Sequence, residues 1–166
     1  WKAQAFKRLT PLVGSTNMLV CGEDLGMIPE SVPDVMNKLQ ILSLEIERMP
    51  KTPQREFSDL FSLPYNSVCT TSTHDMSPLR NWWKEDREKI QRYYNNVLHY
   101  EGQAPGECSS EIASRIITNH LATNSMLTII PLQDWFAIDD TVKRKDIEAE
   151  RINVPANSNH YWCYRM

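Results

Sequence analysis

Three short apolar or β-branched runs of this 166-residue chain are each followed by a pair of polar side chains. The pairs are Glu23–Asp24, His74–Asp75 and Gln133–Asp134. Two carboxylates that share a pocket suit glycosidic chemistry, because one acid protonates the leaving oxygen while the other stabilises an oxocarbenium-like transition state. A single such pair is most often a solvated turn or a helix cap, so the prediction depends on a fold that brings the pairs together.

The runs before these pairs alternate with amphipathic stretches, which predicts strands that alternate with helices. The predicted strands cover residues 18–21, 41–46, 67–73 and 126–130, and Glu45 and Arg48 end the second of them. Strand–helix alternation favours parallel strands joined by right-handed crossovers. The loops after parallel strands build the active sites of such folds. The sequence therefore predicts an α/β fold with about four parallel strands and the polar pairs at one edge.

Capping residues and apolar stripes predict the helices. One begins near Ser31 to Pro33, and a second follows Ser77–Pro78 and carries its apolar face through residues 90–98. A third, capped by Ser109 or Ser110, has its stripe over residues 112–121. Prolines at both ends of residues 50–64 predict a long loop between the second and third strands.

Charge and cysteine content narrow the function classes. The chain carries 18 Lys and Arg against 21 Asp and Glu, a formal charge of -3, which argues against nucleic acid or an anionic membrane as the main partner. The chain has no apolar run of about 20 residues, so the sequence predicts no membrane-spanning helix. The four cysteines, Cys21, Cys69, Cys108 and Cys163, form no CxxC pair, so we expect reduced thiols and a cytoplasmic protein rather than zinc or disulfides.

Metal and aromatic signals are weaker. His74–Asp75 also occurs in metal phosphohydrolases, but the further His and Asp ligands that such sites need are missing, so no metal is predicted. Trp82, Trp83 and Trp135 have flat faces that suit sugar rings, and packing in the core is an equally good interpretation.

Longer motifs around the polar pairs resemble one family. They are residues 22–29 (GEDLGMIP), 44–51 (LEIERMPK), 71–83 (TSTHDMSPLRNWW), 131–134 (PLQD) and 151–155 (RINVP). In this order they resemble the 4-α-glucanotransferases of glycoside hydrolase family 77, most closely the larger disproportionating enzymes related to the plant cytosolic enzyme and to bacterial amylomaltase. The resemblance covers essentially the whole chain.

The resemblance implies a fold and a set of roles. The fold would be the C-terminal half of a (β/α)8 barrel, about four β/α units, with residues 1–166 a partial catalytic domain truncated at both ends. Glu23 would be the general acid/base and Asp75 would stabilise the transition state, while His74 and Asp24 would be substrate-binding, Asp24 also orienting Glu23 or a neighbouring loop. The nucleophilic Asp of the family lies on an earlier strand, outside this chain. No metal or organic cofactor is implied.

The implied partners are α-1,4-glucans and maltooligosaccharides, with neither nucleic acid nor membrane. Two alternatives stay open at this point: a non-catalytic carbohydrate-binding or structural half-barrel module, and a hydrolase of the α-amylase clan that uses water as acceptor. A half barrel has open sheet edges and an uncovered apolar face, so we expect the isolated chain to associate with itself.

Overall fold

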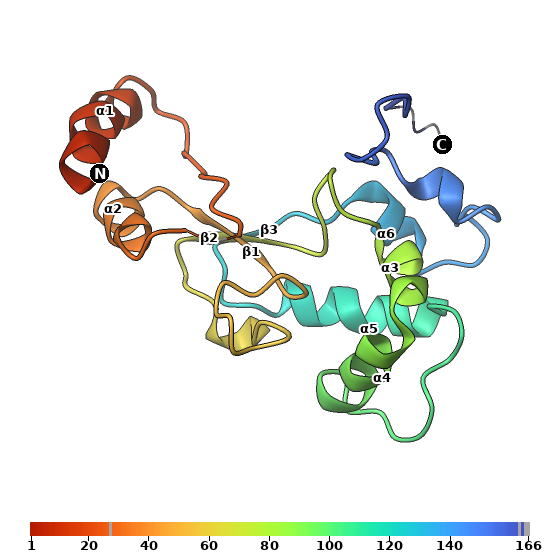
Figure 1. The fold of residues 1–166 in the computed structure, drawn as a ribbon. Coiled ribbons are helices and arrows are strands. Elements are labelled where there is room, and N and C mark those ends of the chain that lie inside the picture. The colour runs from red at the N-terminus through yellow and green to blue at the C-terminus, as the bar shows by residue number, and fades with distance from the viewer. Residues whose placement is uncertain (27, 163, 165–166) are drawn as a thin grey trace. The chain divides into compact units, whose positions relative to one another are not determined.

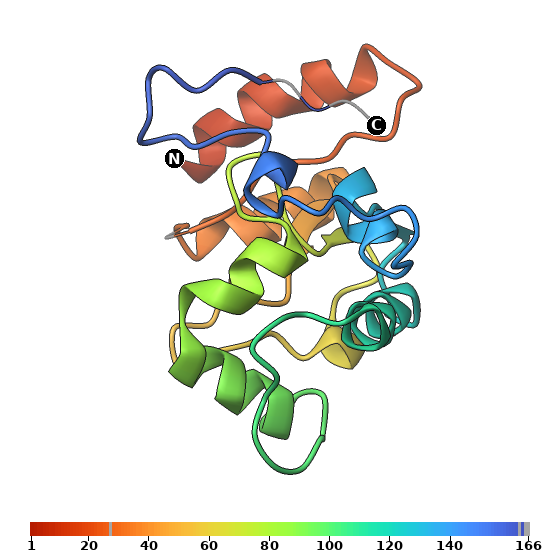
Figure 2. The same cartoon turned by 90° about the vertical axis from the view of Figure 1, so that its right-hand side faces the viewer.

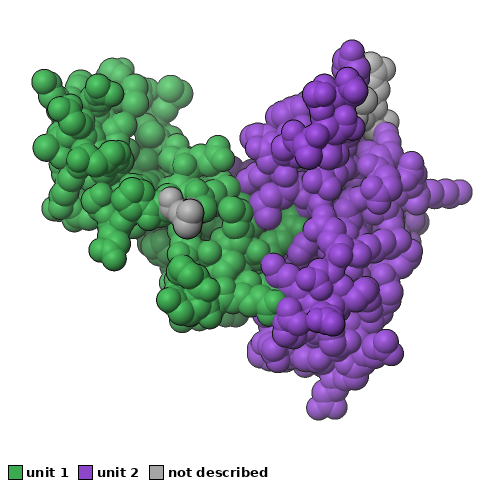
Figure 3. Space-filling model, in the orientation of Figure 1, with its two compact units in different colours: residues 1–69, 123–128 green, residues 70–122, 129–166 purple. Residues whose placement is uncertain are grey.

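The computed structural model describes residues 1–26, 28–162 and 164 (Figures 1 and 2). Its internal contacts divide the chain into two compact units, shown in Figure 3. Unit 1 comprises residues 1–69 and 123–128, and unit 2 comprises residues 70–122 and 129–166. Within the part of the chain that is described, no helix is long and apolar enough to cross a membrane.

Unit 1 begins with two helices, α1 (Lys2–Gly14) and α2 (Ser31–Leu39). The second was predicted, and it buries Val35 and Met36. The first was not, because Trp1 gives it no side-chain cap and Pro11 lies inside it, so the usual helix signals are missing.

The sheet of unit 1 has three short strands in the order β1-β2-β3. They are β1 (Ser43–Ile46), β2 (Ser67–Thr70), whose last residue falls in unit 2, and β3 (Leu127–Thr128). β2 pairs with β3 in parallel, with Val68 opposite Leu127. The chain reaches β3 from β2 through α3, α4 and α5, so these two parallel strands are joined by a helical connection.

The predicted first strand, residues 18–21, is reduced to a single parallel bridge between Cys21 and Leu42. Leu42 donates its N–H to the Val20 carbonyl at 2.9 Å and accepts from Gly22 N–H at 2.8 Å. Met18 lies ahead of the bridge and is 76% exposed. The segment is therefore extended beside β1, but it contacts a strand partner only at its end. Residues 50–64 form the predicted loop, with one 3-10 turn, η1 (Leu60–Ser62).

Unit 2 contains four helices among its described residues. They are α3 (Leu79–Glu85), α4 (Arg87–Asn96), α5 (Ser110–Leu121) and α6 (Leu132–Phe136), and a 3-10 turn, η2 (Glu148–Glu150), follows them. The prediction of one helix after Ser77–Pro78 was wrong, because Asp86 takes an extended conformation and caps α4 by accepting the Lys89 N–H at 3.0 Å. The predicted cap of α5 is confirmed, with Ser109 Oγ accepting from Ile112 N–H at 3.2 Å.

Two of the tryptophans belong to the core of unit 2. Trp82 and Trp83 are 6% and 0% exposed, and both meet Tyr93 edge to face, with ring centroids 4.9 and 6.3 Å apart. Trp83 also donates its indole N–H to the Pro105 carbonyl at 2.9 Å. Packing thus accounts for both residues, whereas Trp135 is 38% exposed.

Candidate active site

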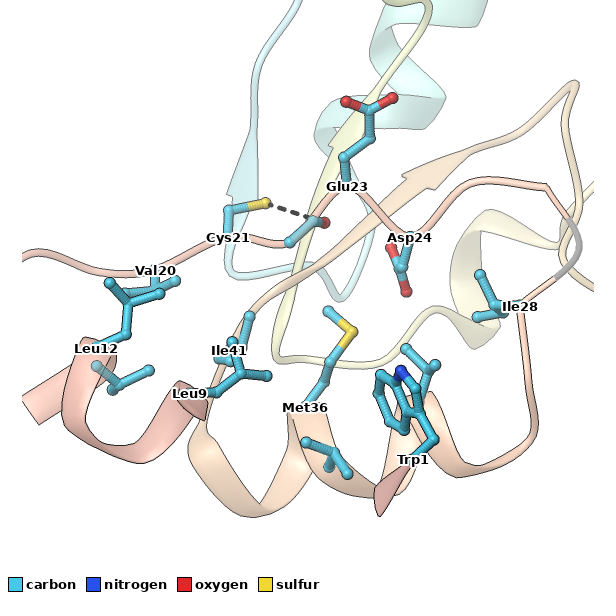
Figure 4. A pocket seen from close by; sticks show the side chains of 14 residues that line it. Trp1, Leu9, Leu12, Val20, Cys21, Glu23, Asp24, Ile28, Met36 and Ile41 are labelled. Carbon is cyan, nitrogen blue, oxygen red and sulfur yellow. Dashed lines mark hydrogen bonds between the residues drawn. The ribbon is translucent and has the colours of Figure 1, made fainter. Parts of the chain in front are cut away.

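Glu23 follows directly after the bridge at Cys21, in the segment Gly22 to Asp24. Gly22 packs tightly against α2, since a Cβ atom at this position would lie 3.0 Å from Met36 Cε. Glu23 is exposed, and Figure 4 shows its carboxylate directed away from the apolar pocket below it. The position predicted for a general acid/base is therefore open to a ligand.

Asp24 is buried, in contrast to its neighbour. One carboxylate oxygen, Oδ1, accepts the backbone N–H of Leu44 in β1 at 2.9 Å, and Oδ2 accepts from Lys51 Nζ at 2.7 Å. Lys51 also donates to Glu45 Oε1 at 2.8 Å, and that oxygen accepts from Ser43 Oγ at 2.7 Å. Glu45 thus lies within β1 and takes part in a protein-internal network, rather than ending the strand as the sequence predicted.

His74 and Asp75 lie together at the surface of unit 2, each with a side chain 50% exposed. His74 Nε2 is 3.4 Å from Asp75 Oδ2. The other oxygen, Oδ1, accepts from Asn153 Nδ2 at 2.5 Å. Both oxygens of the Asp75 carboxylate therefore have a partner, and the side chain still reaches solvent.

The third polar pair, Gln133–Asp134, is buried in α6 and does not line an open edge. Asp134 accepts from Thr71 Oγ1 at 2.5 Å and from the backbone N–H of Leu79 at 2.8 Å. It therefore ties together the chain before His74 and the start of α3. Gln133 Nε2 donates to the Glu150 carbonyl at 3.2 Å. The pair therefore has a structural role in the part of unit 2 that carries His74 and Asp75.

A buried ion pair completes this support. Arg80 of α3 pairs with Glu150 of η2, and it also donates to the Arg144 carbonyl at 2.8 Å. Burial raises the pKa of the Glu150 carboxyl, and the charge of Arg80 opposes that shift. The Arg80–Glu150 ion pair therefore has a structural role, since it joins α3 to η2 in the interior of unit 2.

Trp162 is an aromatic neighbour of the site that the sequence patterns did not single out. Its ring centroid lies 5.1 Å from that of His74, with the planes tilted by 41°, and the side chain is 61% exposed. No local spacing relates residue 162 to residue 74, so only the fold could reveal this contact.

The described residues also include three of the four cysteines and the side chains that could ligate a metal. Across the described residues, no group of three His, Cys, Asp or Glu side chains is placed to hold a metal ion. Cys21, Cys69 and Cys108 are free thiols, and Cys163 lies outside the described residues. Burial raises the pKa of Cys69 and of Cys108 to about 12, which keeps both thiols protonated.

The chain thus has an α/β fold, with an exposed glutamate after the extended segment at Cys21 and an exposed His–Asp pair after β2. The model of the 4-alpha-glucanotransferase family matches residues 1–166, and the chain belongs to this family.

Individual relatives agree with this assignment. The chain is 41% identical to the 4-alpha-glucanotransferase DPE2 of Oryza sativa subsp. japonica over 166 residues, which cover 100% of the chain and 18% of the rice protein. It is 28% identical to the 4-alpha-glucanotransferase of Chlamydia pneumoniae, over 98% of the chain and 31% of that protein. The chain thus spans less than a third of either relative.

A solved structure shows the same fold. The amylomaltase from Streptococcus agalactiae in complex with acarbose matches with a TM-score of 0.72 at 20% identity. The match covers 99% of this chain and 30% of the amylomaltase. Amylomaltase from Corynebacterium glutamicum matches with a TM-score of 0.66 at 19% identity, over 87% of this chain and 24% of that one.

Proposed function

We propose that this chain is part of the catalytic domain of a 4-α-glucanotransferase, which moves α-1,4-glucan segments or glucosyl units between maltooligosaccharides. The observation that carries the proposal is the match of the 4-alpha-glucanotransferase family to every residue from 1 to 166. The complex of the similar amylomaltase with acarbose supports a glucan site in this fold. The comparisons do not favour the non-catalytic module.

The roles of four residues follow from the motifs. Glu23 acts as general acid/base, and its exposure suits that role. Asp75 stabilises the positive charge that develops on the sugar, and His74 contacts the same sugar. Asp24 was predicted to bind substrate. Because both of its oxygens accept hydrogen bonds from Leu44 and Lys51, it serves the substrate by fixing the position of Glu23.

The reaction retains configuration through two displacements. A nucleophile, which we place in a part of the domain outside this chain, attacks the anomeric carbon while the glycosidic C–O bond breaks. Glu23 gives its proton to the leaving oxygen. In the second step an acceptor hydroxyl returns a proton to Glu23 as its oxygen attacks the same carbon and releases the nucleophile. No cofactor is required.

We further assign the chain to the C-terminal half of a (β/α)8 barrel. The extended segment at Cys21, β1, β2 and β3 are neighbours in the order in which the chain visits them, as in such a barrel. Free thiols at the three described cysteines support a cytoplasmic location. Self-association of the isolated chain is supported by an apolar pocket of about 400 Å³ between α1 and α2, lined by Leu9, Leu12 and Met36 among others (Figure 4).

Glu23→Gln in the full-length protein tests the proposal. Loss of the general acid is expected to slow transfer from maltotriose by about 10²- to 10⁴-fold. The matched control is Glu30→Gln, an exposed glutamate seven residues further on, which should transfer at the wild-type rate. Rates are measured by chromatography of the products. Near-normal disproportionation of maltotriose by Glu23→Gln would refute the assignment.

The same products separate a transferase from a hydrolase. Transfer yields chains longer than maltotriose, whereas hydrolysis yields only shorter ones. We expect longer chains from the wild-type protein.

A further inference from the structure

We propose that Lys51 is a positioning residue for Glu23, which acts by holding two buried carboxylates beside the loop that carries this glutamate. The inference rests on the proposed role of Glu23 as general acid/base. Lys51 lies in a loop 28 residues further along the chain, at the end of the family motif over residues 44–51, which gave it no role.

Glu23 is held in place through its two neighbours in the chain rather than through its own side chain. Gly22 donates its N–H to the Leu42 carbonyl at 2.8 Å, and Asp24 accepts the Leu44 N–H at 2.9 Å. Their two partners are close together, since Leu42 lies directly before β1 and Leu44 lies within it. The backbone of Glu23 is therefore held on both sides, and its carboxylate points away from the apolar pocket (Figure 4).

One of these two contacts, that of the Asp24 carboxylate, depends on the ammonium group of Lys51. The Asp24 side chain is 6% exposed and that of Glu45 is 10% exposed, and Lys51 Nζ lies 2.7 and 2.8 Å from their respective oxygens. Two partly buried carboxylates that face each other without a cation repel strongly, because the low polarity of the interior weakens screening.

The carboxylates of Asp24 and Glu45 have room to move apart. A cavity of about 110 Å³ borders Asp24, Glu45 and Lys51. Without the ammonium, Asp24 can turn away from Leu44, and the Glu23 backbone then loses its anchor on that side. A shift of about 1 Å in a catalytic group can cost about 10²-fold in rate.

The experiment uses Lys51→Met and Lys51→Arg in the full-length protein. Lys38→Met is the matched control, because Lys38 also pairs with an aspartate, Asp34, but its side chain is 57% exposed. Transfer is measured with two donor substrates. Maltotriose needs a proton on its leaving oxygen, whereas α-maltosyl fluoride releases fluoride without an acid.

Lys51→Met is expected to slow transfer from maltotriose by about 10²-fold, while the first burst of fluoride release stays near the wild-type rate. Lys51→Arg keeps the positive charge and should retain most of the transfer. Lys38→Met should behave as wild type. A purely structural role of Lys51 would instead lower both rates together, and this outcome, or wild-type transfer by Lys51→Met, overturns the inference.

The double variant Glu45→Gln/Lys51→Met tests the charge argument. It removes one of the two carboxylate charges along with the ammonium, so it should recover part of the transfer lost in Lys51→Met. A double variant that transfers no faster than Lys51→Met counts against the inference. If Lys51→Met does not fold, the same two rates are compared in the double variant. A loss of transfer from maltotriose with a near-normal fluoride burst supports the inference, and an equal loss of both rates overturns it.

Glu23→Gln is measured in parallel to separate the two proposals. If it keeps transfer from maltotriose, the proposed function fails, however the Lys51 variants behave. If it loses transfer but keeps the fluoride burst, and Lys51→Met equals wild type, only the Lys51 inference fails.

Discussion

The loops that carry the two predicted catalytic carboxylates are held in opposite ways. Within the described part of the chain, no hydrogen bond or ion pair joins the Glu23 carboxylate to another side chain, but its backbone is anchored on both sides by Gly22 and by the Asp24–Lys51 pair. The Asp75 carboxylate is instead gripped directly by Asn153 and His74.

This difference matches the two proposed roles. A group that gives and takes a proton must exchange partners during the reaction, so its position is best fixed through the backbone. A group that only stabilises charge works best when its oxygens are preorganised by hydrogen bonds. The contrast predicts which substitutions disturb each loop.

The largest expected contrast concerns the cysteines that precede the loops. Cys21 comes before Glu23 and is exposed, whereas Cys69 lies in β2 before the His74 loop and is 0% exposed. Burial, and then the charge of Asp24, raise the pKa of Cys21, but burial raises that of Cys69 to about 12. At about pH 8 a thiol with that pKa is ionised in about one molecule in 10⁴.

Iodoacetamide should therefore label Cys21 in the native full-length protein at least about 10²-fold faster than Cys69, because only the thiolate reacts. Peptide mass spectrometry over a time course measures both rates. In urea the two sites should react at similar rates, which serves as the control. Equal native labelling would mean that the two strand ends are equally open, and the contrast between the loops would be lost.

Local motifs name candidate site residues, whereas the contacts that support them depend on the fold. The sequence pointed to Glu23, His74 and Asp75 because their residue types and motifs are local, and all three are exposed in the structure. Lys51 and Asn153 were not given positions beside Asp24 and Asp75, because contacts over 27 and 78 residues depend on the tertiary fold. The same reason explains why Gln133–Asp134 appeared to end a strand but lies in α6.

Asp134→Ala is expected to give the next largest effect. It tests the hydrogen bonds that hold the chain on either side of His74 and Asp75. Its removal takes a buried acceptor away from the Thr71 hydroxyl and from the Leu79 N–H. The free energy of unfolding should fall by about 3 kcal/mol, since each unsatisfied buried donor costs about 1–3 kcal/mol. Urea denaturation of the full-length protein measures the change.

The control is Asp140→Ala, another aspartate of unit 2, whose side chain is 73% exposed. It should change the free energy of unfolding by less than about 0.5 kcal/mol. If both variants lose the same stability, Asp134 is not the anchor of the His74 loop.

Asn153→Ala gives the smallest effect and addresses the grip on Asp75 itself. The amide donates to Asp75 Oδ1 at 2.5 Å, and Asn153 is 9% exposed. A hydrogen bond to a charged group contributes at least about 1.5 kcal/mol, so kcat for transfer from maltotriose should fall by about tenfold or more. In the proposed role Asp75 acts mainly in the transition state, so KM should change little. Asn159→Ala, an exposed asparagine in the same segment, should keep the wild-type kcat. A rise in KM with unchanged kcat would assign Asn153 to substrate binding instead, and the two loops would then no longer differ in how their carboxylates are held.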